Sequence, residues 1–262
     1  MMQATIPGQV INRERNTILE IAELSHCFVH NGTAEPVFRS ISMSIQRGEL
    51  VCLIGRSGCG KSTLLQIIAG FLIPSQGCCL LEGKQIIKPG PDRCVVFQED
   101  ALFPWLTVRE NIAFGLNSKT MAKKERHREV DRFLNLVGLQ EYGDYLPRAL
   151  SGGMKQRVAL ARVLILSPSI LLMDEPFGAL DAQTRADMQD LLLTLSQEGK
   201  LTILFVTHDV QEAVTIADRV LLLDGKIGQI REEVRIELNK PRDQSAHLFQ
   251  RYCTQLHKYL RR

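Results

Sequence analysis

The sequence lacks any apolar run long enough to cross a membrane. The longest, LLQIIAGFLI at residues 64–73, contains Gln66, whereas a transmembrane helix needs about 20 mostly apolar residues. The first 17 residues, MMQATIPGQVINRERNT, also lack the apolar core of a secretory signal. We therefore expect a chain that neither spans a membrane nor is secreted, with residues 1–17 as a flexible N-terminus.

Cysteine is present, but without the spacing of a metal site. Cys78 and Cys79 are adjacent, and the other five of the seven cysteines stand singly. An odd number also cannot pair completely within one chain. Reduced thiols in a cytoplasmic protein are therefore expected. Cys59 lies in a glycine-rich stretch, where it is either simply a small residue that fits or a redox-sensitive thiol.

The sequence also has little net charge. It holds 32 Lys and Arg against 29 Asp and Glu, a formal net charge of +3. Nucleic-acid-binding domains usually carry a strong basic excess, so no nucleic-acid partner is expected. The basic residues gather locally, in SKTMAKKERHREVDR at residues 118–132 and HKYLRR at residues 257–262.

What the sequence does contain is the strand pattern of a parallel sheet. Four apolar segments predict buried strands, at residues 49–55, 93–98, 169–176 and 201–209. Near-continuous apolar strands suit a parallel sheet covered by helices on both faces. In such sheets ligands bind beyond the carboxyl ends of the strands. Polar residues end three of the four segments, namely Gln98, Asp174 with Glu175, and His208.

Two other regions have a different pattern. Residues 18–45 predict an antiparallel meander with a turn at Asn31-Gly32. Residues 99–165 are helix-rich and charged, which indicates a helical subdomain inserted into the sheet domain and ending in the helix SGGMKQRVALARVLI. The expected organisation is one domain over residues 18–240, followed by a short basic helix at 241–262.

The glycine-rich stretch GRSGCGKST fits the phosphate-loop pattern G-x-x-x-x-G-K-[ST] between a strand and a helix. Its backbone N–H groups would bind phosphate, Lys61 would reach the β- and γ-phosphates, and Ser62 would ligate Mg²⁺. The predicted binding residues are Gly55, Arg56, Ser57, Gly58, Cys59, Gly60, Lys61, Ser62 and Thr63. The alternative is a chance glycine-rich turn, but the flanking strand and helix favour an α/β P-loop NTPase.

The polar strand ends predict the chemistry beside this loop. Asp174 would hold Mg²⁺ and Glu175 would orient or deprotonate the attacking water, although two acids can also simply cap a helix. Gln98 would contact Mg²⁺ or the water, and His208 the γ-phosphate, although each alone could be an ordinary solvated residue. The nucleotide is expected to be ATP, because NKPR has Arg242 where a guanine-reading N-K-x-D motif has its acid.

These motifs, in this order, resemble the ATP-binding subunit of ABC transporters over residues 18–231. The most specific element is LSGG at residues 150–153 followed by KQR, with GALD at residues 178–181 and the later histidine. The resemblance implies two subunits packed head-to-tail, identical or closely homologous. The partner would close over the bound γ-phosphate with Ser151, Gly152 and Gly153, and Asp181 would lie at the same interface.

The resemblance also assigns one aromatic residue and shows one departure. Phe28 would stack on the adenine. The family commonly has Gln after LSGG, where this chain has Met154. Methionine makes no strong hydrogen bond, so a contact made by that side chain is not expected here.

Residues 101–116, ALFPWLTVRENIAFGL, resemble the branch that imports nitrate, taurine, aliphatic sulfonates and bicarbonate. This implies a peripheral subunit at the cytoplasmic face of the membrane that hydrolyses ATP for a small-anion importer. Its partners would be a second ATP-binding subunit, a polytopic permease docked on the helical subdomain and, indirectly, a solute-binding protein. The alternatives are a soluble ABC-type ATPase of DNA repair or translation, and a monomeric P-loop kinase.

Overall fold

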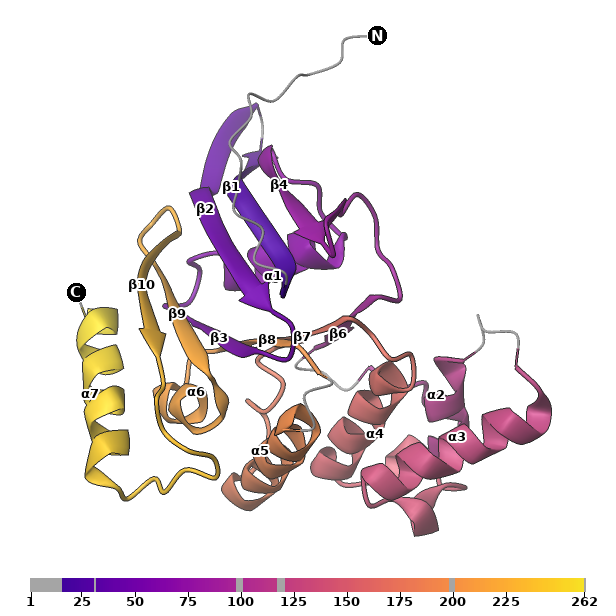
Figure 1. Cartoon of the computed structure of the whole chain (residues 1–262). Coiled ribbons are helices and arrows are strands. Elements are labelled where there is room, and N and C mark those ends of the chain that lie inside the picture. The colour runs from indigo at the N-terminus through magenta and orange to yellow at the C-terminus, as the bar shows by residue number, and fades with distance from the viewer. Residues whose placement is uncertain (1–15, 31, 98–100, 117–120, 198–200, 262) are drawn as a thin grey trace, which may run out of the picture.

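The computed structural model describes residues 16–30, 32–97, 101–116, 121–197 and 201–261. Two β-sheets lie one above the other, and a helical region extends to one side of the lower sheet (Figure 1). Helix α1 lies between the sheets, and the other helices lie at or below the level of the lower sheet. The α/β fold class expected from the sequence is confirmed.

The lower sheet has six strands in the order β10-β9-β3-β8-β7-β6. They are β3 (Leu50–Ile54), β6 (Arg93–Val96), β7 (Ile170–Asp174), β8 (Ile203–Thr207), β9 (Arg219–Asp224) and β10 (Gln229–Arg235). All neighbours pair in parallel except β9 and β10. The four predicted strands are confirmed, and every residue of β3 and β8 is buried, as their apolar sequences require.

The upper sheet is antiparallel, in the order β2-β1-β4-β5. Its strands are β1 (Thr17–His30), β2 (Thr33–Gln46), β4 (Gln76–Leu81) and β5 (Lys84–Gln85). The predicted hairpin is confirmed, since His30 pairs with Thr33 around Gly32, whose φ is 78°; Asn31 lies outside the described residues. The strands β4 and β5 were not predicted. A core of buried residues from both sheets and α1 (Lys61–Ala69) joins the two layers.

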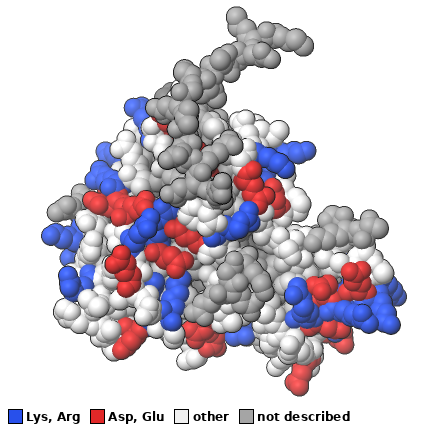
Figure 2. Space-filling view, in the orientation of Figure 1, with Lys and Arg blue, Asp and Glu red and all other residues white. Residues whose placement is uncertain are grey.

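The helical region holds α2 (Val108–Phe114), α3 (Lys123–Leu136), two short 3-10 turns at Gln140–Tyr142 and Pro147–Ala149, and α4 (Gly152–Leu164). Helix α2 packs against both α3 and α4. Helix α3 buries Val130, Phe133 and Leu134. Its outer face carries both signs of charge side by side, and this is where charge gathers most densely on the helical region in Figure 2. The outer surface of this helix is therefore a solvated, mixed-charge face.

Three more helices complete the fold, namely α5 (Ala182–Gln197), α6 (Val210–Ile216) and α7 (His247–Arg261). Helix α7 buries Phe249, Cys253 and Leu256 and packs on α6 and β9. Within the described part of the chain, no helix combines the length and the apolar character that a membrane span requires. All seven cysteines are described, and all are free thiols.

Candidate functional site

The phosphate-loop stretch connects the end of β3 to the start of α1, and its backbone path requires glycine. A Cβ atom on Gly55 would lie 2.1 Å from the carbonyl oxygen of Leu223. Gly60 has a φ of 99°, and its Cβ would meet Val37 at 2.8 Å and Phe38 at 3.0 Å. The loop therefore passes so close to its surroundings that side chains at these two positions are excluded.

Lys61 is the first residue of α1 and is buried, with 6% of its surface exposed. Its ammonium group donates to the carbonyl oxygens of Gly55 at 2.9 Å and Arg56 at 3.0 Å, so it lies over the loop. Gly60 is the N-cap of α1 and has no side chain to accept from the first helical N–H groups. These donors and the positive end of the helix suit an anion such as phosphate.

Ser62 and Asp174 lie together where β7 ends beside α1. The Ser62 hydroxyl donates to Asp174 Oδ1 at 3.1 Å. Burial raises the pKa of Asp174, and the neighbouring Glu175 charge adds to this, while the Ser62 hydrogen bond acts in the opposite direction. Two oxygen ligands beside a phosphate site suit Mg²⁺, which keeps water and phosphate oxygens as its other ligands. Gln98, the other predicted ligand, lies outside the described residues.

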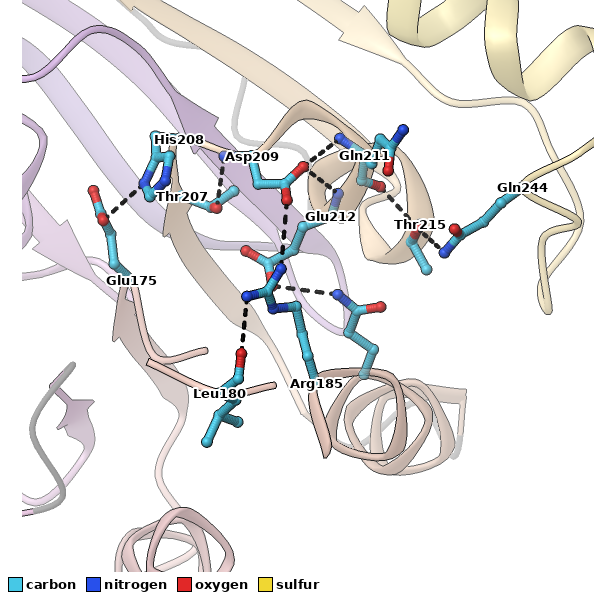
Figure 3. Close-up of polar contacts among 11 residues, drawn as sticks. Glu175, Leu180, Arg185, Thr207, His208, Asp209, Gln211, Glu212, Thr215 and Gln244 are labelled. Carbon is cyan, nitrogen blue, oxygen red and sulfur yellow. Dashed lines mark hydrogen bonds and ion pairs between the residues drawn. The ribbon is translucent and has the colours of Figure 1, made fainter. Parts of the chain in front are cut away.

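Glu175 follows β7 in a backbone conformation that is unusual for its residue type. Its φ is 46°, in the left-handed region, and its N–H donates to the carbonyl oxygen of Val206 at 2.9 Å. Non-glycine residues held in this region cost about 1–3 kcal/mol and cluster at functional sites. The carboxylate points toward His208, whose Nδ1 lies 2.9 Å from Oε2 of Glu175 (Figure 3).

A second network links Asp209, the residue after His208, to the segment GALD at residues 178–181. Arg185 on α5 donates to the carbonyl oxygen of Leu180 at 3.0 Å and lies 3.8 Å from the Asp209 carboxylate (Figure 3). Asp209 follows His208 directly and caps α6. The sequence analysis did not identify Arg185. No local pattern in the sequence marks it, because its carboxylate partner, Asp209, comes from a different part of the fold.

Residues of this network also line a small cavity of about 50 Å³, together with Glu175, Thr207, His208 and Glu212. It is large enough to hold a buried water. Glu212 is 6% exposed and accepts from Gln189 Nε2 at 3.3 Å. Burial raises the pKa of Glu212, while its hydrogen bonds with Thr207 and Gln189 act in the opposite direction. A buried carboxyl group whose pKa is raised therefore lies beside the Glu175–His208 pair.

The signature stretch LSGG forms the start of α4. Ser151 is the N-cap, and its hydroxyl accepts from the N–H of Met154 at 3.3 Å. A Cβ on Gly153 would lie 2.1 Å from Cγ2 of Thr184, in the first turn of α5. Thr184 in turn donates to Asp181 from its N–H at 3.0 Å and its hydroxyl at 2.7 Å, and these bonds lower the pKa of Asp181. The signature and Asp181 therefore both lie next to Thr184.

The predicted site residues form two separate groups. One comprises Lys61, Ser62, Asp174, Glu175 and His208, at the carboxyl ends of β3, β7 and β8. The other surrounds a cavity of about 270 Å³ lined in part by Ser151, Gly153, Met154 and Thr184, and no residue of the first group lines it. One chain therefore presents its phosphate loop and its signature as distinct surfaces.

Phe28 lies on β1 with 39% of its surface exposed. The ring of His26 meets it edge-on at a centroid distance of 4.9 Å and lies 6.2 Å from the ring of Phe38. Phe38 packs against the position of Gly60 in the phosphate loop. A row of rings therefore connects the exposed Phe28 face to the loop. That face is free to stack on a planar base.

Cys59 is buried in the phosphate loop, with 4% of its surface exposed. Burial raises the pKa of its thiol, although the Lys61 charge acts in the opposite direction. A buried thiol with a raised pKa is chemically inert. The structure therefore favours the interpretation of Cys59 as a small residue that fits, rather than a redox-sensitive one.

Comparisons with known sequences agree on one family. A model of the ABC transporter family matches residues 38–178. The uncharacterised ABC transporter ATP-binding protein MJ0412 of Methanocaldococcus jannaschii is 46% identical, over 93% of this chain and 92% of its own. The nitrate import ATP-binding protein NrtD of Synechocystis is 47% identical, over 84% and 83%. The bicarbonate transport ATP-binding protein CmpC of Synechococcus elongatus is 50% identical, over 78% of this chain and 31% of that longer protein.

Solved structures agree as well. The protein cbiO1 from Clostridium perfringens, part of the cbiONQ ABC transporter complex, superimposes with a TM-score of 0.77 at 29% identity, covering 85% of this chain and 90% of that one. A dimeric post-hydrolysis structure of the cassette MJ0796 bound to ADP and Pi gives a TM-score of 0.73 at 28% identity, covering 85% and 100%. This chain therefore belongs to the ABC transporter family and is one of its ATP-hydrolysing cassettes.

Proposed function

We propose that this cassette powers the import of a small anion, such as nitrate, bicarbonate, taurine or an aliphatic sulfonate. The observation that carries the proposal is the similarity, over most of this chain, to proteins named for nitrate import and bicarbonate transport. The alternative role in DNA repair or translation gains no support from any relative or structure named above. The cassette would sit peripherally on the cytoplasmic face of the membrane and respond to a solute-binding protein through the permease.

The residues of the first group would carry the ATP chemistry. Lys61 and the loop N–H groups would bind the phosphates, and Ser62 and Asp174 would hold Mg²⁺, which neutralises the charge that develops on the phosphates. Glu175 would take a proton from the attacking water, and His208 would contact the γ-phosphate. This assignment is supported by the Ser62–Asp174 and Glu175–His208 contacts, which arise on adjacent elements of the sheet edge.

Two chains would share each ATP. The separate signature surface, with Ser151, Gly152 and Gly153 at the N-terminus of a helix, suits a phosphate bound by another chain. The dimeric cassette of known structure supports this arrangement. ATP binds a closed pair better than an open one, so binding would close the two chains and hydrolysis would reopen them.

A loop in the helical region offers a surface for the permease. Trp105 is 71% exposed, yet its loop is firmly held by the buried side chain of Asn111. The Asn111 amide donates to the carbonyl oxygens of Phe103, Leu106 and Thr107 at 2.9–3.1 Å and accepts from the Phe103 N–H at 2.9 Å. A large aromatic side chain presented on a rigid loop is typical of an interface anchor. The permease is the partner expected of an importer cassette.

The test is purification of tagged protein from its native membranes in mild detergent, with mass spectrometry of the bound proteins. We expect a polytopic membrane protein in equal amount. Trp105→Ala should lose that partner while the isolated cassette keeps its ATPase activity, and Leu248→Ala, which removes a 53%-exposed apolar side chain from α7, should keep it. Soluble repair or ribosomal partners alone would overturn the importer role and leave the ATPase assignment intact.

A further inference from the structure

The side chain of Arg56, the second residue of the phosphate-loop stretch, binds the far end of the chain. Its Nε and Nη2 atoms donate to the carbonyl oxygen of Leu260 at 2.9 and 2.7 Å. Leu260 lies in the last turn of α7, 204 residues away. The last carbonyl groups of a helix have no partner within it and form the negative end of its dipole. The forked Arg56 guanidinium therefore caps α7.

Helix α7 is a firm support for this contact. Phe249 is fully buried, and Cys253 and Leu256 continue the same face into the core. The segment before α7 is also fixed, because Arg242 donates to the carbonyl oxygens of Val214 at 2.6 Å and Ala217 at 2.7 Å. An anchor on this helix is consequently held in place relative to the central sheet.

The other end of the contact reaches the nucleotide-binding lysine. The carbonyl oxygen of Arg56 accepts from Lys61 Nζ at 3.0 Å and from the N–H of Cys59 at 3.4 Å. A single residue thus joins the Lys61 ammonium and the turn of the loop, through its backbone, to α7, through its side chain. Residues 56–58 are all exposed to solvent, so no buried packing holds this part of the loop.

We propose that Arg56 is a positioning residue for ATP binding, which uses the last turn of α7 to hold the phosphate loop in its binding conformation. The inference rests on the ATPase activity of the family and does not depend on the importer role. A loop that is already ordered loses less conformational entropy when it binds phosphate. The backbone N–H groups bind ATP similarly in its ground and transition states, so the contact should act on KM more than on kcat.

The experiment combines changes at both ends of the contact. Arg56→Ala removes the guanidinium. Ending the chain at His257 removes the Leu260 carbonyl, together with the half-buried Tyr259 and Leu260 side chains, and keeps the buried Phe249, Cys253 and Leu256 of α7. Each should raise the KM for ATP by about 3- to 30-fold while kcat changes by less than about threefold. The two changes together should raise KM no more than the larger single effect, because they break one interaction.

Two further variants separate positioning from mere stabilisation. Arg56→Lys keeps the positive charge and one donor nitrogen and should restore part of the affinity. Arg251→Ala, which removes an exposed arginine from α7, should leave KM unchanged. Hydrogen exchange of the amides at residues 57–60 should quicken in Arg56→Ala before any nucleotide is added. The proposal is overturned if KM stays the same while only the melting temperature falls. It is also overturned if the fold-increase in KM of the double change equals the product of the two single fold-increases. If the shortened chain does not fold, the KM of Arg56→Ala and its rescue by lysine decide alone.

Discussion

The Nδ1 atom of His208 lies 2.9 Å from Oε2 of Glu175. The two residues follow adjacent parallel strands, β8 and β7, in which Asp174 pairs with Val206. The left-handed conformation of Glu175 turns its carboxylate toward the histidine. The contact holds the proposed base at a fixed place, at the edge where Lys61 and the phosphate loop also lie. Removal of the Glu175 carboxylate is therefore the most direct test of its proposed role as the base in ATP hydrolysis.

We expect Glu175→Gln to bind ATP as the parent does but to hydrolyse it roughly 10²- to 10⁴-fold more slowly, which is the usual effect of losing a general base. Glutamine keeps the size and a hydrogen bond to His208 but cannot take a proton. Phosphate release and equilibrium nucleotide binding would be measured on both proteins. Glu141→Gln, a change to an exposed acid in the helical region, is the control. Unchanged turnover in Glu175→Gln would remove this residue from the mechanism.

We expect Ser151→Arg to retain ATP binding by the isolated chain but to lose ATP-dependent pairing of two chains. A bulky cation at the N-terminus of α4 would block the surface proposed to close over the partner's phosphate. Molecular mass in solution would be measured with ATP, in the slowly hydrolysing Glu175→Gln background. Leu248→Arg, which places the same cation at a 53%-exposed position on α7, serves as control. Normal pairing of Ser151→Arg would contradict a role of the signature in a partner's site.

The contact between α4 and α5 gives a prediction with a built-in rescue. In Gly153→Ala the new Cβ would lie 2.1 Å from Thr184 Cγ2, which should cost about 1–3 kcal/mol of stability and lower ATPase activity. Adding Thr184→Ser removes the clashing methyl and keeps the hydroxyl that donates to Asp181. Thermal unfolding and turnover of the double variant should approach those of the parent.

The control for this prediction is Gly152→Ala, because a Cβ there would meet only Leu180, at 4.0 Å. It should melt close to the parent temperature. The prediction is contradicted if both glycine variants lose equally in melting temperature and turnover, or if the Gly153→Ala, Thr184→Ser double variant does not recover. Either result would show that Gly153 is not needed for the close packing of α4 on α5.

The sequence was sufficient to predict those features that depend on local pattern. The strands β3, β6, β7 and β8 are continuous apolar segments, and continuous burial is what such segments require. The phosphate loop, Ser62 and Asp174 were expected together because the carboxyl ends of parallel strands share one edge. In the structure the Ser62 hydroxyl donates to Asp174, so these two residues lie together at that edge of the sheet. The roles of the site residues stay predictions that the variants above test.

The features that the sequence did not reveal depend on distant partners. Arg56 meets Leu260 across 204 residues, and no local pattern marks these two residues as partners. Arg185 connects residue 180 to Asp209 only because α5 and α6 pack together. The strands β4 and β5 are short and partly exposed, so they have little of the apolar alternation by which a strand is recognised.

Glu212 gives a pH-dependent prediction. Burial raises its pKa in the folded chain, so between the unfolded and folded pKa values the folded state binds more protons than the unfolded state. Stability should therefore fall as the pH rises through that window. Glu212→Gln does not titrate, so it should flatten this dependence and, above the window, melt at a higher temperature than the parent. The measurement is thermal unfolding from pH 5 to 8, with Glu237→Gln, at an exposed glutamate, as control. Parallel curves for the parent and Glu212→Gln would show that burial of this carboxyl does not govern the pH response.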